Sequence, residues 1–234
     1  MKRHLPNAIT LLNLLGGCCT VVCILYGQVE MAFFFYVFSS IADFLDGALA
    51  RALKVKSELG KQLDSLADMV SFGFVPGLVF YDLLAPDLPA MLHWQALPGF
   101  LVTLFAALRL GKFNLDTRQT DSFLGLPTPA CTMFAMGIML IAFFDTYGLG
   151  SFILQPVFLY ACIVLLSGLM VSELPMFSLK ISGLNWKGNE IRFIFAAAAL
   201  AALFIMREAA LAAIIVAYVL FSAALHLITG KQQS

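Results

Sequence analysis

The chain has 234 residues, of which 61% are hydrophobic and only 12% are charged, and its mean hydropathy is +0.93. Soluble domains contain about 45–50% apolar and about 25% charged residues, so this composition excludes a soluble domain and a disordered chain. The 14 basic residues balance the 14 acidic ones, which leaves no net positive charge to attract a nucleic acid, and we expect a polytopic membrane protein.

Eight apolar segments follow one another along the chain, and about 20 apolar residues suffice to cross a bilayer as a helix. No linker or low-complexity tract divides them, so we expect one domain over residues 1–234. The pattern predicts an all-α membrane bundle of about eight transmembrane helices, at approximately 7–26, 31–53, 62–84, 94–113, 128–145, 150–171, 191–206 and 208–228.

Two places in this pattern carry local signals. Gly73, Pro76 and Gly77 interrupt the third segment and predict a kinked helix. Only Arg207 and Glu208 separate the last two segments. We interpret them as two helices because a single helix over both would far exceed the thickness of a bilayer.

The basic residues divide unequally between the two sets of loops that eight spans create. Only Arg207 falls on one side. The other side holds Lys2, Arg3, Arg51, Lys54, Lys56, Lys61, Arg109, Lys112, Arg118, Lys180, Lys187, Arg192 and Lys231. Because cytoplasmic loops are enriched in Lys and Arg, the pattern predicts that both termini lie in the cytoplasm.

Four aspartates lie near the predicted cytoplasmic ends of the second and third segments. Carboxylates within membrane spans are costly and indicate a functional site. Asp43 and Asp46 are three residues apart and Asp64 and Asp68 are four apart, so each pair shares one face of its helix. A short basic turn joins the two segments, which run antiparallel, so the acidic faces can converge.

Four converging carboxylates would repel one another unless cations neutralise them. Oxygen ligands in a tight group suit Mg²⁺, Mn²⁺ or Ca²⁺, and two such ions would balance four charges. Gly47, Ala50 and Gly60 leave room for a ligand near the acids, and the guanidinium of Arg51 could hold a diphosphate. The pattern is typical of a phosphoryl-transfer site, but acids that line the cation pathway of a transporter would give a similar spacing.

The segments 43–51 and 60–68 read DFLDGALAR and GKQLDSLAD. They resemble the signature D-x-x-D-G-x-x-A-R followed by G-x-x-x-D-x-x-x-D of the CDP-alcohol phosphotransferase family, with every fixed position filled and the expected gap of eight residues. Pro6, Asn7 and Thr10 resemble the family's usual entry into its first helix. The resemblance implies an integral membrane enzyme that moves a phospho-alcohol from a CDP carrier to an acceptor hydroxyl and releases CMP.

Further segments resemble the phosphatidylserine synthase branch of that family, namely 64–73 with Pro76, 109–114 and 125–130. This branch commonly has eight spans, which implies core helices over about 7–206 and an additional C-terminal helix over about 208–228. The resemblance implies CDP-diacylglycerol and L-serine as substrates, phosphatidylserine and CMP as products, and a role in phospholipid biosynthesis. It also implies a homodimer. From the resemblance together with the split of the basic residues, we expect the active site on the cytoplasmic side of the cell (inner) membrane.

The resemblance assigns roles to particular residues. Asp43, Asp46 and Asp64 would bind two divalent ions, either Mg²⁺ or Mn²⁺. Asp68 would contribute to the second ion and act as the general base, because the serine hydroxyl is a poor nucleophile until a carboxylate accepts its proton. The residues implied in binding CDP-diacylglycerol are Asn7, Thr10, Gly47, Ala50, Arg51 and Gly60.

The carboxylate of a serine acceptor would need a cation, and Arg109 and Lys112 are the candidates for it. Two other functions stay open. Phosphatidylglycerophosphate and phosphatidylinositol-phosphate synthases share the aspartates, but they need a phosphate pocket with more basic residues. A cation-coupled transporter would show flux of its substrate without release of CMP.

Overall fold

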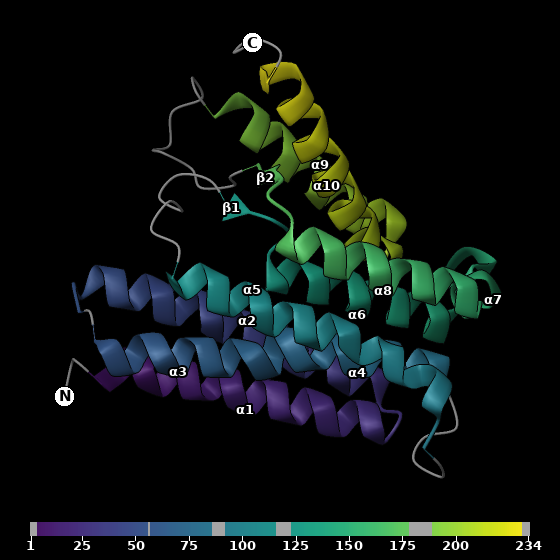
Figure 1. Cartoon of the computed structure of the whole chain (residues 1–234), viewed down its shortest axis with the longest axis horizontal. Helices are drawn as coiled ribbons and strands as arrows, with labels where there is room; N and C mark the ends of the chain where they lie inside the picture. Colours follow the sequence, from purple (N-terminus) through teal and green to yellow (C-terminus); the bar gives the residue numbers. More distant parts are fainter. Residues whose placement is uncertain (1–3, 56, 86–91, 116–122, 178–188, 231–234) are drawn as a thin grey trace.

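The computed structural model describes residues 4–55, 57–85, 92–115, 123–177 and 189–230, and these residues are mostly helical (Figure 1). The predicted all-α class is confirmed. The π-helical turn Met69–Phe74 joins the helix that ends at Asp68 to the one that begins at Val75, and the 3₁₀ turns Trp94–Phe100 and Thr146–Gly148 each precede a further α-helix. The helices are α1 (Leu5–Leu25), α2 (Val29–Ala52), α3 (Glu58–Asp68), α4 (Val75–Leu84), α5 (Leu101–Leu115), α6 (Thr128–Phe144), α7 (Gly150–Ile153), α8 (Pro156–Val171), α9 (Glu190–Met206) and α10 (Ala209–Gly230).

Several of these helices are long and apolar enough to cross a membrane. In the described residues they are Leu5–Leu25, Val29–Ala52, Glu58–Leu84, Trp94–Leu115 and Ala209–Ile228, while Thr128–Phe144 and Pro156–Val171 are apolar but shorter. The length and composition of these helices are those of an integral membrane protein. The number of spans, predicted as eight, stays a prediction. The predicted break between the last two helices is confirmed, because the backbone turns at Arg207 with a φ of +52°.

The residue pattern of α1 shows why the bundle suits lipid. Its large apolar side chains, among them Leu11, Leu15 and Val22, are exposed. A soluble protein would bury such residues, whereas in a membrane lipid covers them and small residues let helices approach. The buried residues of α1 recur at helical spacing and are mostly small or polar: Pro6, Thr10, Asn13, Gly16, Gly17, Thr20 and Ile24.

The kink predicted in the third segment takes the form of the π-helical turn Met69–Phe74. Pro76 has no N–H to donate to the carbonyl oxygen of Phe72, and its ring would clash with that carbonyl in a regular α-helix. The wider π turn relieves the clash, and the hydroxyl of Thr132 on α6 donates to the same carbonyl at 3.0 Å. The turn directly follows Asp68, which ends α3, and it therefore determines how the end of α3 is placed against the neighbouring helices.

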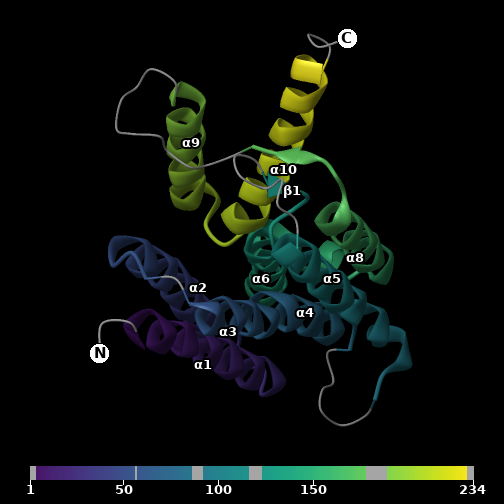
Figure 2. The ribbon, with the colours of Figure 1, turned by 60° about the vertical axis from the view of Figure 1, so that its left-hand side comes forward.

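Helices α1 to α5 lie alongside one another, with α1 packed on α2 and α3, and α5 packed on α8. The α9–α10 hairpin leans away from this group in both views of the ribbon (Figures 1 and 2). Its largest contact with the rest of the described chain is that of α10 with α6, where a Cβ on Gly137 would lie 2.7 Å from the backbone nitrogen of Ala212, and α10 also packs on β2. Helix α9 has no buried residue.

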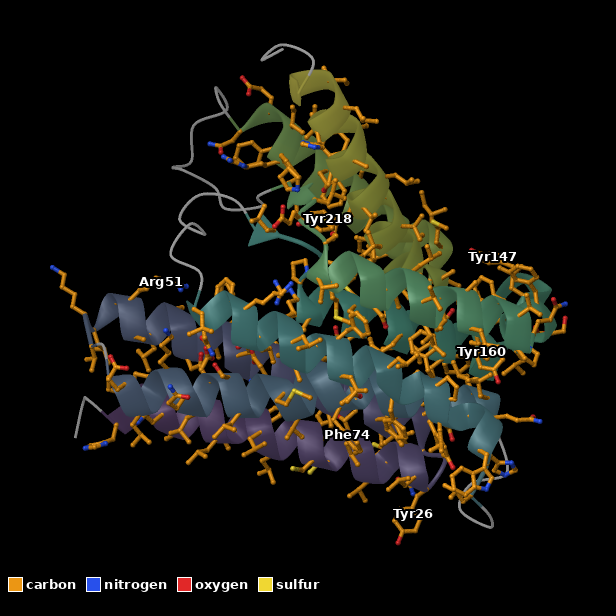
Figure 3. All side chains as sticks on the ribbon, in the orientation of Figure 1. Tyr26, Arg51, Phe74, Tyr147, Tyr160 and Tyr218 are labelled. Atoms are coloured by element: carbon orange, nitrogen blue, oxygen red, sulfur yellow. The ribbon has the colours of Figure 1, made fainter. Side chains whose placement is uncertain are left out.

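The two ends of the bundle differ in character. Arg51 lies at the end where α2 finishes, and Tyr26, Tyr147 and Tyr160 lie toward the opposite end (Figure 3). Tyrosine is enriched at membrane interfaces and cations in cytoplasmic loops. Of the cations used to predict topology, Lys2, Arg3, Lys56, Arg118, Lys180, Lys187 and Lys231 lie outside the described residues. The side of the membrane that the Arg51 end faces therefore stays a prediction.

A short strap fixes the start of α6. Strands β1 (Phe123–Leu124) and β2 (Pro175–Met176) pair antiparallel. Gly125 then donates its N–H to the carbonyl of Leu174 at 2.9 Å with a φ of +74°, and a Cβ there would lie 2.6 Å from the carbonyl oxygen of Met170. Only glycine fits this left-handed, crowded position. The segment after α8 thereby holds the residues that begin α6.

Candidate functional site

The aspartates of α2 and α3 meet beside α1, against which both helices pack. Asp43, Asp64 and Asp68 can each offer one carboxylate oxygen, and these three oxygens lie within 4.8 Å of one another. The predicted convergence of the two acidic faces is therefore observed for three residues. Asp46 stands outside this group, but it is 5% exposed and its Oδ2 is buried without a hydrogen-bond partner.

This set of acids fits a hard divalent cation. Carboxylate oxygens are the ligands that Mg²⁺ and Mn²⁺ prefer. In the described part of the chain, none of the four aspartates forms an ion pair with a Lys or Arg, and a buried carboxylate oxygen such as Oδ2 of Asp46 is costly without a partner. A cation bound here would supply the missing partner.

A cavity of about 610 Å³ opens on one side of the acids, between the start of α1, the end of α2 and the start of α3. Five of the six residues predicted to bind CDP-diacylglycerol line it, and the sixth, Arg51, lines the neighbouring cavity. The full lining is Pro6, Asn7, Thr10, Asp46, Gly47, Ala50, Val55, Ser57, Glu58, Gly60, Lys61 and Asp64.

The first turn of α3 forms one wall of this cavity. Ser57 caps the helix by accepting the N–H of Gly60 at 2.9 Å. Gly60 brings α3 close to α1, since a Cβ there would lie 3.0 Å from Oδ1 of Asn7. A helix N-terminus carries partial positive charge and free N–H groups, so this wall favours an anionic ligand.

A second cavity of about 390 Å³ lies on the other side of the acids. The two cavities share Asp46, Gly47 and Asp64, so they meet at the carboxylates. The second one is lined by Asp43, Phe44, Asp46, Gly47, Arg51, Asp64, Asp68, Arg109, Leu110, Phe113, Pro127, Thr128 and Pro129. Its outer wall is therefore the start of α6 that the strap holds in place.

The guanidinium of Arg109 is the buried cation of this second cavity. Arg109 is 8% exposed, its Nε is buried without a hydrogen-bond partner, and its Cζ lies 6.0 Å from the centre of the Phe113 ring. A buried, unpartnered guanidinium nitrogen favours an anion. Lys112 is exposed and lines neither cavity, so the structure separates the two candidates for the serine carboxylate.

A sequence model of the CDP-alcohol phosphatidyltransferase family matches residues 3–168. The chain belongs to this family. Three similar proteins bear the name CDP-diacylglycerol–serine O-phosphatidyltransferase. The Bacillus subtilis protein is 32% identical over 172 residues, which cover 74% of this chain and 89% of the relative. A Helicobacter pylori protein is 33% identical over 171 residues (72% and 70%), and the Mycobacterium leprae protein is 31% identical over 179 residues (74% and 57%).

The matched region of this CDP-alcohol phosphatidyltransferase contains every residue that lines the two cavities. The family depends on metal in general, and the acidic group of Asp43, Asp64 and Asp68 is the place in this chain that suits it. Strand β2 and helices α9 and α10 lie beyond the match, but β2 holds β1 next to the start of α6. A part of the chain outside the match thus helps to shape the second cavity.

The sequence reasoning missed one buried residue at the site. Asn13 is 0% exposed and its Nδ2 donates to Oδ1 of Asp68 at 3.3 Å. The signal was present, because Thr10, Asn13, Gly17 and Thr20 form a polar and small stripe at helical spacing within an apolar run. It also missed Ser57, whose place before a helix start is typical of an N-cap.

Proposed function

We propose that this membrane protein transfers the phosphatidyl group of CDP-diacylglycerol to the hydroxyl of L-serine, giving phosphatidylserine and CMP. The observation that carries the proposal is the meeting of two cavities at one group of carboxylates. A transfer between two substrates needs a donor pocket and an acceptor pocket that open on the same reacting phosphorus. The names of the relatives support serine as the acceptor.

In this proposal the larger cavity receives the CDP group. Its volume of about 610 Å³ suits a nucleotide, and Asn7, Thr10 and the first turn of α3 offer it polar groups. Gly47, Ala50 and Gly60 would let the nucleotide lie close to the backbone. Arg51 would bind the diphosphate where the cavities meet, since a Cβ on Gly47 would lie 3.3 Å from Nη1 of Arg51.

Two divalent ions, either Mg²⁺ or Mn²⁺, would be bound by the four aspartates Asp43, Asp46, Asp64 and Asp68. When bound, such ions neutralise the charge of a diphosphate and of the departing CMP. The fourfold negative charge of the aspartates would otherwise repel the donor substrate. Of the four aspartates, Asp46 is the one that most needs a bound cation, because its buried Oδ2 has no hydrogen-bond partner.

The smaller cavity would receive serine. Arg109 would bind the serine carboxylate, and Asp68 would accept the proton of the hydroxyl as its oxygen attacks. The oxygen–phosphorus bond to serine forms, the bond from phosphorus to the CMP oxygen breaks, and the proton ends on the Asp68 carboxylate. Lys112, exposed and outside the cavity, is the weaker candidate for the carboxylate.

The charge of the smaller cavity favours serine over phosphorylated acceptors. Serine brings one carboxylate, whereas glycerol-3-phosphate or inositol phosphate brings a phosphate with a charge of about −1.5 to −2. In the described chain the cations that line this cavity are Arg51 and Arg109, and Arg51 also serves the diphosphate in this proposal. That leaves one guanidinium for the acceptor, which matches a single carboxylate.

The proposal places the site on the cytoplasmic face of the cell (inner) membrane, in a homodimer. The support for the orientation is the excess of basic residues on one side, and the homodimer follows from the family resemblance. At such an interface the acyl chains stay in lipid while serine and CMP exchange with water.

The test is incubation of the purified protein with CDP-diacylglycerol, Mg²⁺ or Mn²⁺, and one alcohol at a time, with CMP as the readout. We expect CMP release with L-serine and none above background with glycerol-3-phosphate or inositol phosphate. Release with a phosphorylated acceptor instead would assign the chain to another synthase of the family. No CMP release with any acceptor, together with substrate flux into liposomes, would support a transporter.

A further inference from the structure

Asn13 touches the proposed base directly. Its Nδ2 donates to Oδ1 of Asp68 at 3.3 Å, across a contact between α1 and the end of α3. Asn13 is 0% exposed, so its amide has only protein partners. A buried amide without a partner is costly, which makes this contact a fixed part of the site and not an occasional one.

Two serines determine which way the Asn13 amide points. The hydroxyl of Ser71, in the π-helical turn, donates to the backbone carbonyl of Asn13 at 3.1 Å. The hydroxyl of Ser39, on α2, lies 2.7 Å from the same carbonyl and 2.5 Å from Oδ1 of the Asn13 side chain. Since Ser71 already serves the backbone carbonyl, the proton of Ser39 is available for Oδ1, which turns Nδ2 toward Asp68.

Two adjacent glycines make this junction of three elements possible. A Cβ on Gly16 would lie 3.1 Å from Cβ of Ser39, and a Cβ on Gly17 would lie 2.9 Å from Cα of Ser71. Any larger residue would push α2 and the π-helical turn away from α1. The close approach brings Ser39 and Ser71 within reach of Asn13, and the π-helical turn presents Ser71 three residues after Asp68.

We propose that Asn13 is a positioning residue for Asp68, held in its working orientation by Ser39 and Ser71. The amide N–H occupies Oδ1 and fixes the rotation of the carboxyl group, so that Oδ2 is the oxygen that accepts the serine proton. The inference rests on the proposed role of Asp68 as the base. A displacement of about 1 Å at a reacting group can cost about 100-fold in rate, so loss of this contact slows turnover.

The first measurement separates turnover from binding. Asn13→Leu has a similar size and removes the N–H donor, and we expect it to lower kcat about 10- to 100-fold. The KM values for serine and CDP-diacylglycerol should stay within about twofold of wild type. The rise in Tm on adding CDP-diacylglycerol with Mn²⁺ should persist. Ser39→Ala keeps Asn13 but loosens its amide, and we expect a smaller fall in kcat of about 3- to 10-fold.

Thr20→Val is the matched control, because Thr20 is also 0% exposed on α1 but its hydroxyl donates only to the carbonyl of Gly16 in its own helix, at 2.9 Å. Its kcat should equal that of the wild type. If Asn13→Leu does not fold in detergent, Ser39→Ala carries the test alone. A kcat of Ser39→Ala equal to that of the control would then overturn the inference.

A double-mutant cycle with Asp68→Asn shows whether Asn13 acts through Asp68. If it does, adding Asn13→Leu to Asp68→Asn lowers the residual rate by less than about twofold. Losses that multiply would show a general structural role and overturn the inference, as would a full kcat in Asn13→Leu alone. Near wild-type turnover by Asp68→Asn would instead overturn the proposed function, so the two failures are distinguishable.

Discussion

The hydroxyl of Thr132 donates to the carbonyl oxygen of Phe72 at 3.0 Å. Phe72 lies four residues before Pro76, so in a regular α-helix its carbonyl would have had the N–H that proline lacks as its partner. The bond from Thr132 joins α6 to the π-helical turn that follows Asp68. The same α6 begins at Thr128, which lines the smaller cavity. One hydroxyl thus links the segment that follows Asp68 to the helix that forms one wall of the smaller cavity.

Replacement of Thr132 by valine keeps the shape of the side chain and removes this link. We expect Thr132→Val to lower the free energy of unfolding by about 1 kcal/mol, the usual net value of one hydrogen bond, and to lower Tm in detergent. The single hydroxyl proton of Thr132 is shared with the carbonyl oxygen of Thr128 in its own helix, which is also 3.0 Å away. Thr20→Val loses only a bond within its own helix and serves as the control. Equal Tm values for both variants would show that the link to Phe72 contributes nothing.

Removal of divalent metal should abolish the reaction. Asp43, Asp64 and Asp68 hold three carboxylates together without an ion pair in the described chain, so the donor diphosphate would meet uncompensated negative charge. We expect EDTA to stop CMP release and excess Mg²⁺ or Mn²⁺ to restore it. Metal should also raise Tm, because it relieves the repulsion among the acids. Full activity in EDTA would contradict the assignment of the aspartates.

The sequence allowed the acidic site to be predicted because its signals are local. Asp43 and Asp46, like Asp64 and Asp68, are three or four residues apart, and helical geometry alone places each pair on one face. The structure adds which oxygens meet, namely those of Asp43, Asp64 and Asp68, with Asp46 set apart. That difference depends on how α2 and α3 pack against α1, and spacing along one helix contains no information about it.

Gly60 provides a test of whether the larger cavity binds the nucleotide, as proposed. A Cβ at Gly60 would lie 2.8 Å from Oγ of Ser57 and 3.0 Å from Oδ1 of Asn7. We expect Gly60→Ala to displace these groups at a cost of about 1–3 kcal/mol and to raise the KM for CDP-diacylglycerol about tenfold. The KM for serine should change little. Gly111→Ala is the control, since a Cβ there meets nothing within 4 Å, and its kinetics should match those of the wild type.

Arg109 and Lys112 form a second matched pair. Arg109 is buried in the smaller cavity, whereas Lys112 is exposed outside it. A hydrogen bond to a charged group contributes about 1.5–3 kcal/mol, so Arg109→Ala should raise the KM for serine about 10- to 100-fold. The KM for CDP-diacylglycerol should rise far less, and Lys112→Ala should behave as wild type. Equal effects of Arg109→Ala on both substrates would remove Arg109 from the serine site.

Residues that act across helices were harder to predict from the sequence. Arg109 could be named from its position near a span end, but Lys112 looked equivalent until the fold buried one and exposed the other. The local stripe of small and polar residues marks Asn13 as buried but does not give its role, because its partners Ser39, Asp68 and Ser71 are 26 to 58 residues away along the chain. The π-helical turn was expected only as a kink, since its form depends on the packing of α6.

Replacement of Asp68 by asparagine separates the base from a metal ligand. Asp68→Asn keeps the size of the side chain and removes its ability to accept a proton, and loss of a general base typically costs about 10²- to 10⁴-fold in rate. Because Asp68 lies with Asp43 and Asp64, weakened metal binding could contribute to the loss. Titration with Mn²⁺ distinguishes the causes, since excess metal restores a ligand defect and leaves a missing base unrepaired. Binding of CDP-diacylglycerol should survive in Asp68→Asn and fail in Asp43→Asn and Asp64→Asn. If Asp68→Asn turns over serine at a near wild-type rate, the proton leaves through water or another carboxylate.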